Sequence, residues 1–540
     1  MHLVPILTLS LFACVPKLAP SSDADTVATS NDSGLETVDS GDSDTDTDTD
    51  SDTDTDTDSN TDTAAPDADG DGYPATEDCD DTDPATHPDA TEICADGLDQ
   101  DCDGVADNGC GPSGAITLPD GVVLTGESPD DGFGTSVSGG GDVTGDGVDD
   151  LIIGAPGDDD GGSEAGALYV VPGPITSGSI LDAASSKITF TVDGRYLGTQ
   201  ARIIGDTNGD GIADIAVDAP GWSGAWIILG SRDFPRSATL DSLETASVPT
   251  RGYGDASNLA MAADLDWDGD GLDDIFACTG QGGQWVVFGV KGDGSSDGEI
   301  GGEVYDISGL PSRVQSLRGA GDIDGDGLDD LLVGVTDTAY VFQATGGWSG
   351  YAGPGNAYAT LTANAGDSFG TGVAGAGDVD GDGNVDVLVG ASTEEGDLAK
   401  TGAAWLIAGP VKGTIIATGS FTDTVEFVGS DYEGDLGAAV EDAGDLDGDG
   451  HDDFLFGGGT NDGDGATDAG RVWLWRGPDT WGEDPGDAYA TFTGAAAGDE
   501  AGWAISNGGD PNREGSPGIA IGAPGADGGT GAVYLVPAGK

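Results

Sequence analysis

Residues 367–392 read DSFGTGVAGAGDVDGDGNVDVLVGAS, and the acidic centre of this stretch decides how the chain folds. Four aspartates within nine residues repel one another, so the loop needs a positive charge to hold them together. Carboxylates stand at positions 1, 3, 5 and 9, which are Asp378, Asp380, Asp382 and Asp386. The backbone carbonyl of Asn384 can point inward at position 7, and Gly383 at position 6 allows a tight turn. Oxygen-only ligands in a flexible loop favour calcium over magnesium or a transition metal. The following DVLVGAS is strand-like, whereas an EF-hand or dockerin loop continues into a helix.

The acidic stretch recurs throughout residues 111–540. Further loops begin at Asp142, Asp206, Asp266, Asp322 and Asp445, and a degenerate copy begins at Asp510, which gives a spacing of roughly sixty residues. Short apolar runs punctuated by glycine and aspartate predict β-strands joined by turns. A period near sixty residues that holds about four short strands is typical of one blade of a β-propeller. The sequence therefore predicts an all-β, seven-bladed propeller.

Five further loops repeat the ligand positions of residues 378–386. The candidate ligands at positions 1, 3, 5, 7 and 9 are Asp142, Thr144, Asp146, Val148 and Asp150 in blade 1; Asp206, Asn208, Asp210, Ile212 and Asp214 in blade 2; Asp266, Asp268, Asp270, Leu272 and Asp274 in blade 3; Asp322, Asp324, Asp326, Leu328 and Asp330 in blade 4; and Asp445, Asp447, Asp449, His451 and Asp453 in blade 6. Thr144 stands where the other loops carry Asp or Asn, so we expect a weaker site there. The last copy, DPNREGSPG, lacks an acid at position 9 and is expected to bind nothing. The alternative is a set of solvated acidic turns, but six matching copies favour metal sites.

Residues flanking the loops carry a family resemblance. Blade 1 shows Phe133-Gly134 before its loop and Gly154-Ala155-Pro156 after it, blade 5 shows Phe369-Gly370 and Gly390-Ala391-Ser392, and blade 7 shows Gly522-Ala523-Pro524. These units resemble the FG-GAP repeats of the integrin α-subunit propeller, although blades 3 and 4 have lost most of the pattern. The resemblance implies calcium loops on one rim and a ring of seven four-stranded blades. The chain ends soon after the third strand of blade 7, so residues 115–126 are predicted to supply its fourth strand and close the ring.

The charge balance and the N-terminus limit the partners and the location. The chain has 101 acidic and 16 basic residues, a net charge of −85 that excludes nucleic acid as a partner. Residues 1–13 resemble a lipoprotein signal peptide ahead of Cys14 as the lipid-bearing residue; an ordinary secretory signal with an incidental Cys is the alternative. Residues 14–66, rich in Ser, Asp and Thr, predict a disordered acidic tether. We therefore expect an exported outer-membrane or cell-surface lipoprotein that meets the membrane only through its anchor, or else a secreted protein.

Residues 67–110 predict a small metal-binding module framed by cysteines. Its two acidic runs offer Asp67, Asp69, Asp71, Tyr73 and Asp78, and then Asp99, Asp101, Asp103, Val105 and Asp107, as calcium ligands. Cys79, Cys94, Cys102 and Cys110 predict two disulfides with the pairing left open, and a zinc site is the alternative. The segment resembles the MopE-type metal-binding motif of bacterial surface proteins and, more distantly, thrombospondin type 3 repeats. That family name evokes copper, but the residues include a single His and no Met, so calcium is the predicted ion.

Three classes of function are compatible with a propeller. The three His residues are a weak basis for an enzyme: His2 lies in the signal, His87 in the acidic module and His451 at a loop position that offers its carbonyl. A monomeric adhesion or ligand-binding module for a protein or glycan partner is favoured, because loops between second and third strands are long in blades 1, 5 and 6. Those lengths could also be tolerated insertions. A structural surface-layer or calcium-buffering protein remains the alternative, and a hydrolase is the weakest hypothesis.

Overall fold

The computed structural model describes residues 73–74, 78–80, 82–84, 86–88, 100, 102, 114–118, 121–222, 224–243, 245–248, 260–281, 284–292, 304–347, 350–363, 368–392, 402–417, 424–429, 435–462, 466–477, 488–513 and 517–537. The predicted signal peptide, Cys14 and the tether lie outside them. Regular structure in the described part is almost all β-strand. The helices are single turns, α1 (Ile180–Ala183), α2 (Ala526–Gly529) and the 3-10 turns η1 (Pro220–Trp222), η2 (Leu240–Ser242) and η3 (Pro354–Asn356). None of these described helices has the length and hydrophobicity needed to cross a membrane.

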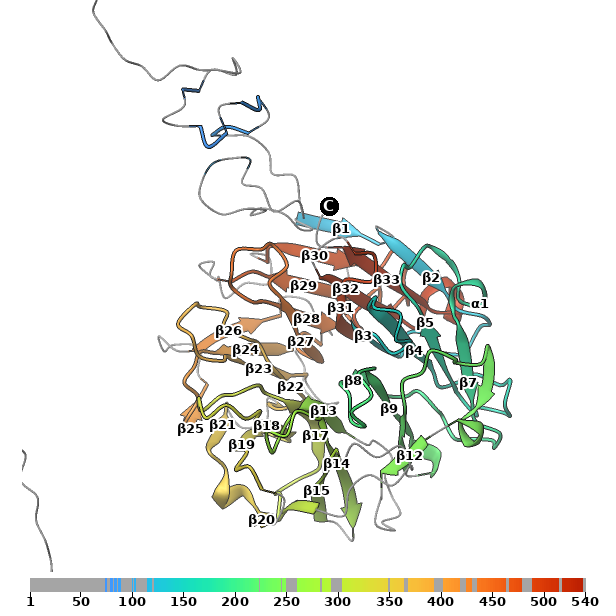
Figure 1. Ribbon diagram of the computed structural model, residues 1–540, viewed down its shortest axis with the longest axis horizontal. Coiled ribbons are helices and arrows are strands. Elements are labelled where there is room, and N and C mark those ends of the chain that lie inside the picture. The colour runs from blue at the N-terminus through green and yellow to red at the C-terminus, as the bar shows by residue number, and fades with distance from the viewer. Residues whose placement is uncertain are drawn as a thin grey trace, which may run out of the picture. The chain divides into compact units, whose positions relative to one another are not determined.

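Seven four-stranded antiparallel blades surround a central channel, which confirms the predicted fold (Figure 1). The first strands, in blade order, are β3 (Ser136–Gly141), β8 (Ala201–Ile204), β13 (Met261–Leu265), β17 (Val314–Gly319), β22 (Gly372–Gly375), β27 (Ala439–Gly444) and β31 (Ala504–Gly509). The second strands are β4 (Asp150–Ala155), β9 (Asp214–Ala219), β14 (Asp274–Gln281), β18 (Leu331–Val335), β23 (Val387–Ala391), β28 (Asp453–Gly458) and β32 (Gly518–Ala523). The first strands of neighbouring blades contact one another, including β31 with β3, so the ring is closed.

The outer half of each blade completes the sheet. The third strands are β5 (Ala167–Val171), β10 (Gly224–Ile228), β15 (Gln284–Val290), β19 (Thr338–Phe342), β24 (Ala403–Ile407), β29 (Arg471–Trp475) and β33 (Ala532–Pro537). The fourth strands are β7 (Ser186–Thr189), β12 (Thr245–Val248), β16 (Val304–Ser308), β21 (Ala359–Thr362), β26 (Thr424–Val428), β30 (Ala490–Thr493) and β2 (Val122–Thr125). The fourth strand of blade 7 therefore comes from the beginning of the propeller segment.

The hydrophobic core lies between blades rather than inside one of them. Second strands are buried on both faces, as in β4 with Leu151, Ile152 and Ile153, because each blade packs against two neighbours. One cluster of buried side chains joins Tyr534 and Leu474 of blades 7 and 6, and equivalent clusters fill the other interfaces of the described ring. A single blade could not bury its two apolar faces alone, so stability requires the ring.

The FG and GAP glycines meet across blade boundaries. A Cβ atom on Gly154 of blade 1 would lie 2.0 Å from the carbonyl oxygen of Gly198 at the start of blade 2. The same close approach joins Gly390 of blade 5 to Gly437 of blade 6, and Gly522 of blade 7 to Gly134 of blade 1. Any side chain there would push the blades apart. The repeat motif is therefore a backbone contact between successive blades.

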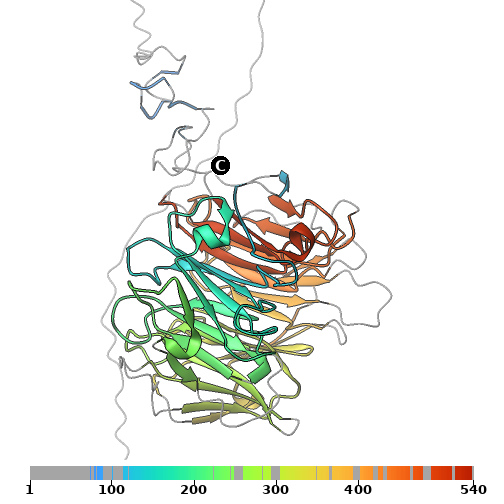
Figure 2. The ribbon, with the colours of Figure 1, turned by 90° about the vertical axis from the view of Figure 1, so that its right-hand side faces the viewer.

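The observed closure of the ring confirms one part of the prediction and shows that another part is wrong. Val122–Thr125 pairs antiparallel with β33 and completes blade 7, as expected. Residues 115–126 do not form a single strand, however, because β1 (Gly114–Thr117) pairs in parallel with β30 of blade 6. The intervening sequence Pro119-Asp120-Gly121 explains the break: proline cannot donate to a ladder, and Gly121 has φ of +92°. In Figure 2 the red strands of blade 7 lie beside the blue-green strands of blade 1.

The position of β1 is part of a repeated arrangement. In other blades, too, the connection between third and fourth strands adds a short parallel strand to the outer edge of the preceding blade. These added strands are β6 (Gly178–Ser179) on blade 7, β11 (Ser237–Thr239) on blade 1, β20 (Gly350–Ala352) on blade 3 and β25 (Gly413–Ile416) on blade 4. The equivalent connections of blades 3 and 6 lie mostly outside the described residues. The added strands cover backbone groups that an edge strand would otherwise expose.

We predict that Leu124, on the closing strand β2, stabilises the propeller as much as a fully buried core residue does. Leu124 is 1% exposed on β2 and packs between blades 7 and 1. Leu124→Ala should lower the free energy of unfolding by about 2–5 kcal/mol through lost contacts and a residual cavity. The matched control is Ile416→Ala on β25, where the side chain is 55% exposed and the expected change is within about 0.5 kcal/mol. Chemical denaturation measures both, and equal effects would contradict closure through β2.

Candidate metal centre

Six acidic loops lie on one rim of the ring. Each connects the first strand of a blade to its second strand, and its last aspartate is at or next to the start of the second strand. Neighbouring loops touch: the backbone N–H of Ala213 in blade 2 donates to the carbonyl of Asp142 in blade 1 at 3.1 Å. The same contact joins Asp452 of blade 6 to Asp378 of blade 5 at 3.3 Å. The rim is therefore a belt of closely spaced carboxylates.

Each loop is wrapped by hydrogen bonds from its own backbone to the carboxylates at positions 1 and 5. In blade 2 the Asp206 carboxylate accepts from the N–H groups of Asp210 at 3.1 Å and Gly211 at 2.6 Å. The Asp210 carboxylate then accepts from Ile212 N–H at 2.9 Å. Glycine is required at position 6 because the backbone is left-handed there, with φ of +81° at Gly211. The backbone of the loop thus holds the side chains at positions 1 and 5 facing inward.

The position 9 aspartate is the most buried group of each loop. The six side chains have no exposed surface: Asp150, Asp214, Asp274, Asp330, Asp386 and Asp453. One oxygen of each accepts a hydrogen bond from the backbone just after the third strand, for example from Gly230 N–H to Asp214 Oδ1 at 2.7 Å. In blade 5, Asp386 Oδ2 also accepts from Val379 N–H at 3.0 Å. This residue therefore ties the loop to the middle of its blade.

Burial of these carboxylates is electrostatically unfavourable without a positive charge. Loss of solvation raises the pKa of the position 9 carboxyl groups above the usual range, to about 6 for Asp150, Asp214 and Asp386, about 7 for Asp274 and Asp330, and about 8 for Asp453. Neighbouring loop aspartates raise the pKa further in each of these blades. A bound cation offsets both effects.

The donor set fits a hard divalent cation. In blades 1, 3 and 4, one oxygen from each of three loop aspartates lies within 4.8 Å of the other two. Asp330 Oδ2 and Asp378 Oδ1 are buried and have no hydrogen-bond partner among the described residues. Every candidate side-chain ligand except Asn208 and Thr144 is a carboxylate, and the set contains no sulfur. Oxygen-only sites of this kind bind calcium or a similar cation.

Sequence reasoning missed the aspartate at position 8. Asp452 Oδ2 of blade 6 accepts from the N–H of Asp378, the first residue of the blade 5 loop, at 2.8 Å. Asp329 of blade 4 does the same for Asp266 of blade 3 at 3.0 Å, and Asp149 of blade 1 for Asp510 of blade 7 at 2.9 Å. The sequence shows two consecutive aspartates at the end of these loops, and the first of the two binds the loop of another blade. In blades 1, 4 and 6 the position 8 aspartate therefore links its loop to a neighbouring loop.

The seventh loop uses different contacts. Gly518 stands at position 9, so this blade lacks the buried carboxylate. Asn512 Oδ1 accepts from Ile175 N–H of blade 1 at 2.9 Å, and Arg513 donates to the Gly147 carbonyl at 3.1 Å. These hydrogen bonds attach the loop to blade 1 directly. We keep the prediction that it binds no metal.

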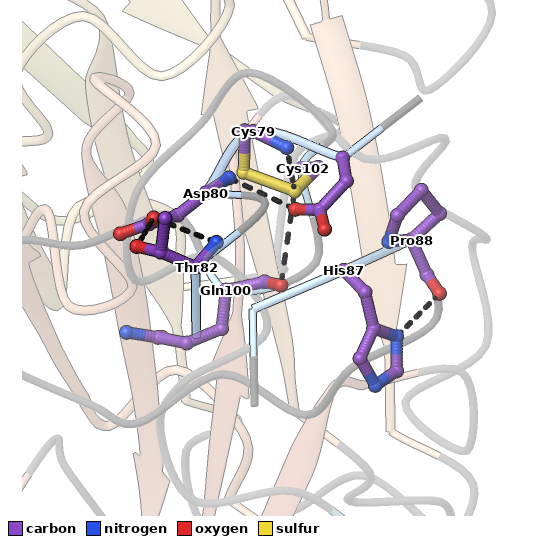
Figure 3. Close-up of a disulfide and its surroundings, with 8 residues drawn as sticks. Cys79, Asp80, Thr82, His87, Pro88, Gln100 and Cys102 are labelled. Atoms are coloured by element: carbon purple, nitrogen blue, oxygen red, sulfur yellow. Dashed lines mark hydrogen bonds between the residues drawn. A yellow bond between two sulfur atoms is a disulfide. The ribbon is translucent and has the colours of Figure 1, made fainter. Parts of the chain in front are cut away.

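The cysteine-framed module is described at a few positions. A disulfide joins Cys79 to Cys102, whose Cα atoms are 5.5 Å apart (Figure 3). This selects one of the pairings left open and removes both sulfurs from a zinc site. Cys94 and Cys110 lie outside the described residues, as do the candidate ligands Asp67, Asp69, Asp71, Asp99, Asp101, Asp103, Val105 and Asp107. Of the remaining two, Asp78 is 8% exposed and Tyr73 stacks on the His87 ring, with centroids 5.0 Å apart.

Comparison with protein families agrees with this geometry. An FG-GAP repeat model matches residues 133–171, which cover the first acidic loop and the second and third strands of blade 1. A Cu-binding MopE model, described as "Putative metal-binding motif", matches residues 78–108. Parts of the chain therefore match an FG-GAP repeat and a MopE-type motif. The copper in that model's name is not matched by a cluster of His or Met in this sequence.

Curated relatives include integrin α subunits. Integrin alpha-PS2 of Drosophila melanogaster is 32% identical over 170 residues, which cover 28% of this chain and 12% of the integrin. Integrin alpha-7 of Mus musculus is 31% identical over 225 residues, covering 41% and 14%. The alignments thus span about an eighth of each relative's length. A chain from the crystal structure of BBS1N in complex with ARL6DN, soaked with lead, aligns over 77% of this chain and 97% of its own, with a TM-score of 0.41 and 11% identity.

We predict that calcium is a folding ligand and that the loops are unequal. Asp382→Ala removes a ligand from a complete loop, and loss of that site should cost roughly 2.7 kcal/mol at a free calcium concentration about 100 times Kd. Asp510→Ala, in the degenerate loop of blade 7, is the matched control and should change stability little. Calorimetry in calcium and in EDTA measures both. Equal melting temperatures in the two conditions, or equal effects of the two substitutions, would contradict the calcium assignment.

Proposed function

We propose that this protein is an exported, calcium-stabilised propeller that binds a protein or glycan partner at the cell surface. Similarity to integrin α subunits supports a general role in adhesion or ligand binding. The proposal includes calcium as the ion, a lipid anchor on Cys14, a monomeric propeller and no catalytic activity. In this view the acidic rim is structural, and recognition takes place at the opposite end of the first strands.

The observation that carries the proposal is a cavity at the channel mouth away from the acidic loops. Its volume is about 400 Å³, and residues at the beginning of all seven first strands line it. Trp503 is 50% exposed at its edge, packed beside the backbone of Gly459 from blade 6. Gln200, Gln315 and Thr371 add amide and hydroxyl groups to the lining. An exposed aromatic ring beside neutral hydrogen-bonding groups suits a sugar ring, so a glycan is the favoured partner.

The channel is closed behind this cavity by charged side chains. Arg202 of blade 2 forms two hydrogen bonds to the Glu441 carboxylate of blade 6, at 2.8 and 3.3 Å. Arg318 of blade 4 lies 3.9 Å from the same carboxylate. A second cavity of about 440 Å³ lies on the acidic-loop side, and these three residues line both cavities. The mouth is therefore a pocket with a charged floor rather than an open pore.

The loops between second and third strands form the surroundings of the mouth. In blade 1 this loop is held by Lys187, whose ammonium lies 2.7 Å from Asp158 and 2.6 Å from Asp160. Most of the long loop of blade 5, and part of that of blade 6, lie outside the described residues. The described loop of blade 1 is consistent with a preformed binding surface beside the pocket.

A second candidate is a surface-layer or calcium-buffering protein without a specific partner. The excess of 101 acidic over 16 basic residues favours it, because such a chain concentrates cations whatever else it does. The two candidate functions predict different roles for Trp503, since calcium buffering does not require an aromatic ring at the channel mouth.

The test is binding of the purified full chain to a glycan array and to cells, in calcium and in EDTA. We expect calcium-dependent binding that Trp503→Ala weakens at least tenfold while the melting temperature stays unchanged. Leu181→Ala, at a side chain that is 45% exposed on α1 and is not part of the pocket lining, is the control and should bind as the wild type does. Binding that survives both EDTA and Trp503→Ala would overturn the proposal and leave the buffering role.

A further inference from the structure

In blades 1 to 6, the residue that directly follows the third strand differs in charge, and this charge affects the neighbouring acidic loop. It immediately precedes the residue whose N–H binds the position 9 aspartate, so its side chain begins next to the loop. Four blades carry a neutral residue there and two carry a basic one; in blade order the residues are Pro172, Leu229, Lys291, Gln343, Ala408 and Arg476. Blades 3 and 6 are the exceptions.

In blade 3 the basic side chain enters the loop. The Lys291 ammonium contacts Asp268 Oδ2 and lies 2.7 Å from Asp270 Oδ2, so it bridges the carboxylates at positions 3 and 5. Asp268 is only 9% exposed and Lys291 is 24% exposed, so solvent screens the pair weakly. The ammonium thus occupies the space between two of the side chains predicted to hold a metal.

In blade 6 a guanidinium takes a similar place. Arg476 Nη1 contacts Asp447 Oδ2, the position 3 carboxylate, which is 2% exposed. The Tyr489 ring holds the guanidinium from the other side, with 4.0 Å between its carbon and the ring centroid. A charge placed between an aromatic face and a buried carboxylate is fixed in the loop rather than free to leave it. In both blades a basic side chain thus contacts the position 3 carboxylate: an ammonium in blade 3 and a guanidinium in blade 6.

We propose that the loops of blades 3 and 6 carry a tethered cation in place of a metal ion, and that calcium is confined to blades 1, 2, 4 and 5. The inference rests on the proposed role of calcium in the other loops. The Lys291 ammonium and the Arg476 guanidinium take up carboxylate oxygens that a calcium ion would need as ligands. Within the described residues, no basic side chain forms an ion pair with the loops that begin at Asp142, Asp206, Asp322 and Asp378.

We thereby reduce the six metal sites predicted from the sequence to four. Blades 3 and 6 have all four carboxylates at the expected positions, so the loop sequence alone does not distinguish them. The distinguishing residues follow the third strand, well beyond the loop. A permanent internal charge keeps these two blades ordered at any calcium concentration, whereas the other four respond to it.

The test is the number of calcium ions bound per full chain, measured by equilibrium dialysis at saturating calcium. Lys291→Gln and Arg476→Gln should each bind one ion more than the wild type, because each frees a complete set of carboxylates. Gln343→Lys, which places an ammonium at the same position in blade 4, should bind one ion fewer. Arg471→Gln, at the start of the strand that Arg476 follows, is the matched control and should leave the number unchanged.

Stability in EDTA gives a second readout. Lys291→Gln should lower the melting temperature in EDTA, where nothing replaces the ammonium, and calcium should restore most of the loss. Unchanged stoichiometry in Lys291→Gln, Arg476→Gln and Gln343→Lys, with circular dichroism showing folded protein, would overturn the inference while leaving calcium binding intact. A wild-type chain that binds no calcium at all would overturn the proposed function as well.

Discussion

Six fully buried aspartates at position 9 are the constraint on which the ring depends. Each carboxylate ties an acidic loop to the backbone that follows the third strand, as Asp386 does through Gly409 N–H at 2.7 Å. Burial raises the pKa of these groups because a lone negative charge is poorly solvated there. The fold therefore needs a positive charge beside each one. In two blades the chain supplies an ammonium or a guanidinium to the position 3 carboxylate of the same loop. In the other four we assign the compensating charge to calcium.

Contacts between blades explain why the repeat has its particular residues. The glycines of the FG and GAP segments let the backbone of one blade touch the next, with Gly522 against Gly134 at the junction where the ring closes. Apolar clusters fill each interface, and short parallel strands cover several outer edges. Position 8 aspartates link neighbouring loops on the acidic rim. Because these interactions all join successive blades, loosening one loop should weaken its neighbour.

Local sequence pattern predicts the blades and their loops, because the sixty-residue period and the carboxylates at positions 1, 3, 5 and 9 are visible in the amino-acid order alone. Contacts between distant segments leave no such pattern: the partner of Asp452 is Asp378, 74 positions away, and Lys291 reaches its loop from the end of another strand. The prediction of one strand over residues 115–126 passes over Pro119-Asp120-Gly121, the turn signal at which the chain moves from one blade to the next.

Anomalous diffraction from crystals of the full chain grown in calcium tests most directly which cation, calcium or a basic side chain, neutralises each acidic loop. We expect calcium peaks in the loops that begin at Asp206, Asp322 and Asp378, and a weaker peak at Asp142, where Thr144 replaces a carboxylate. The loops that begin at Asp266 and Asp445 should show no peak and should contain the Lys291 and Arg476 side chains. Peaks of equal height in all six loops, or none in any of them, would contradict this expectation.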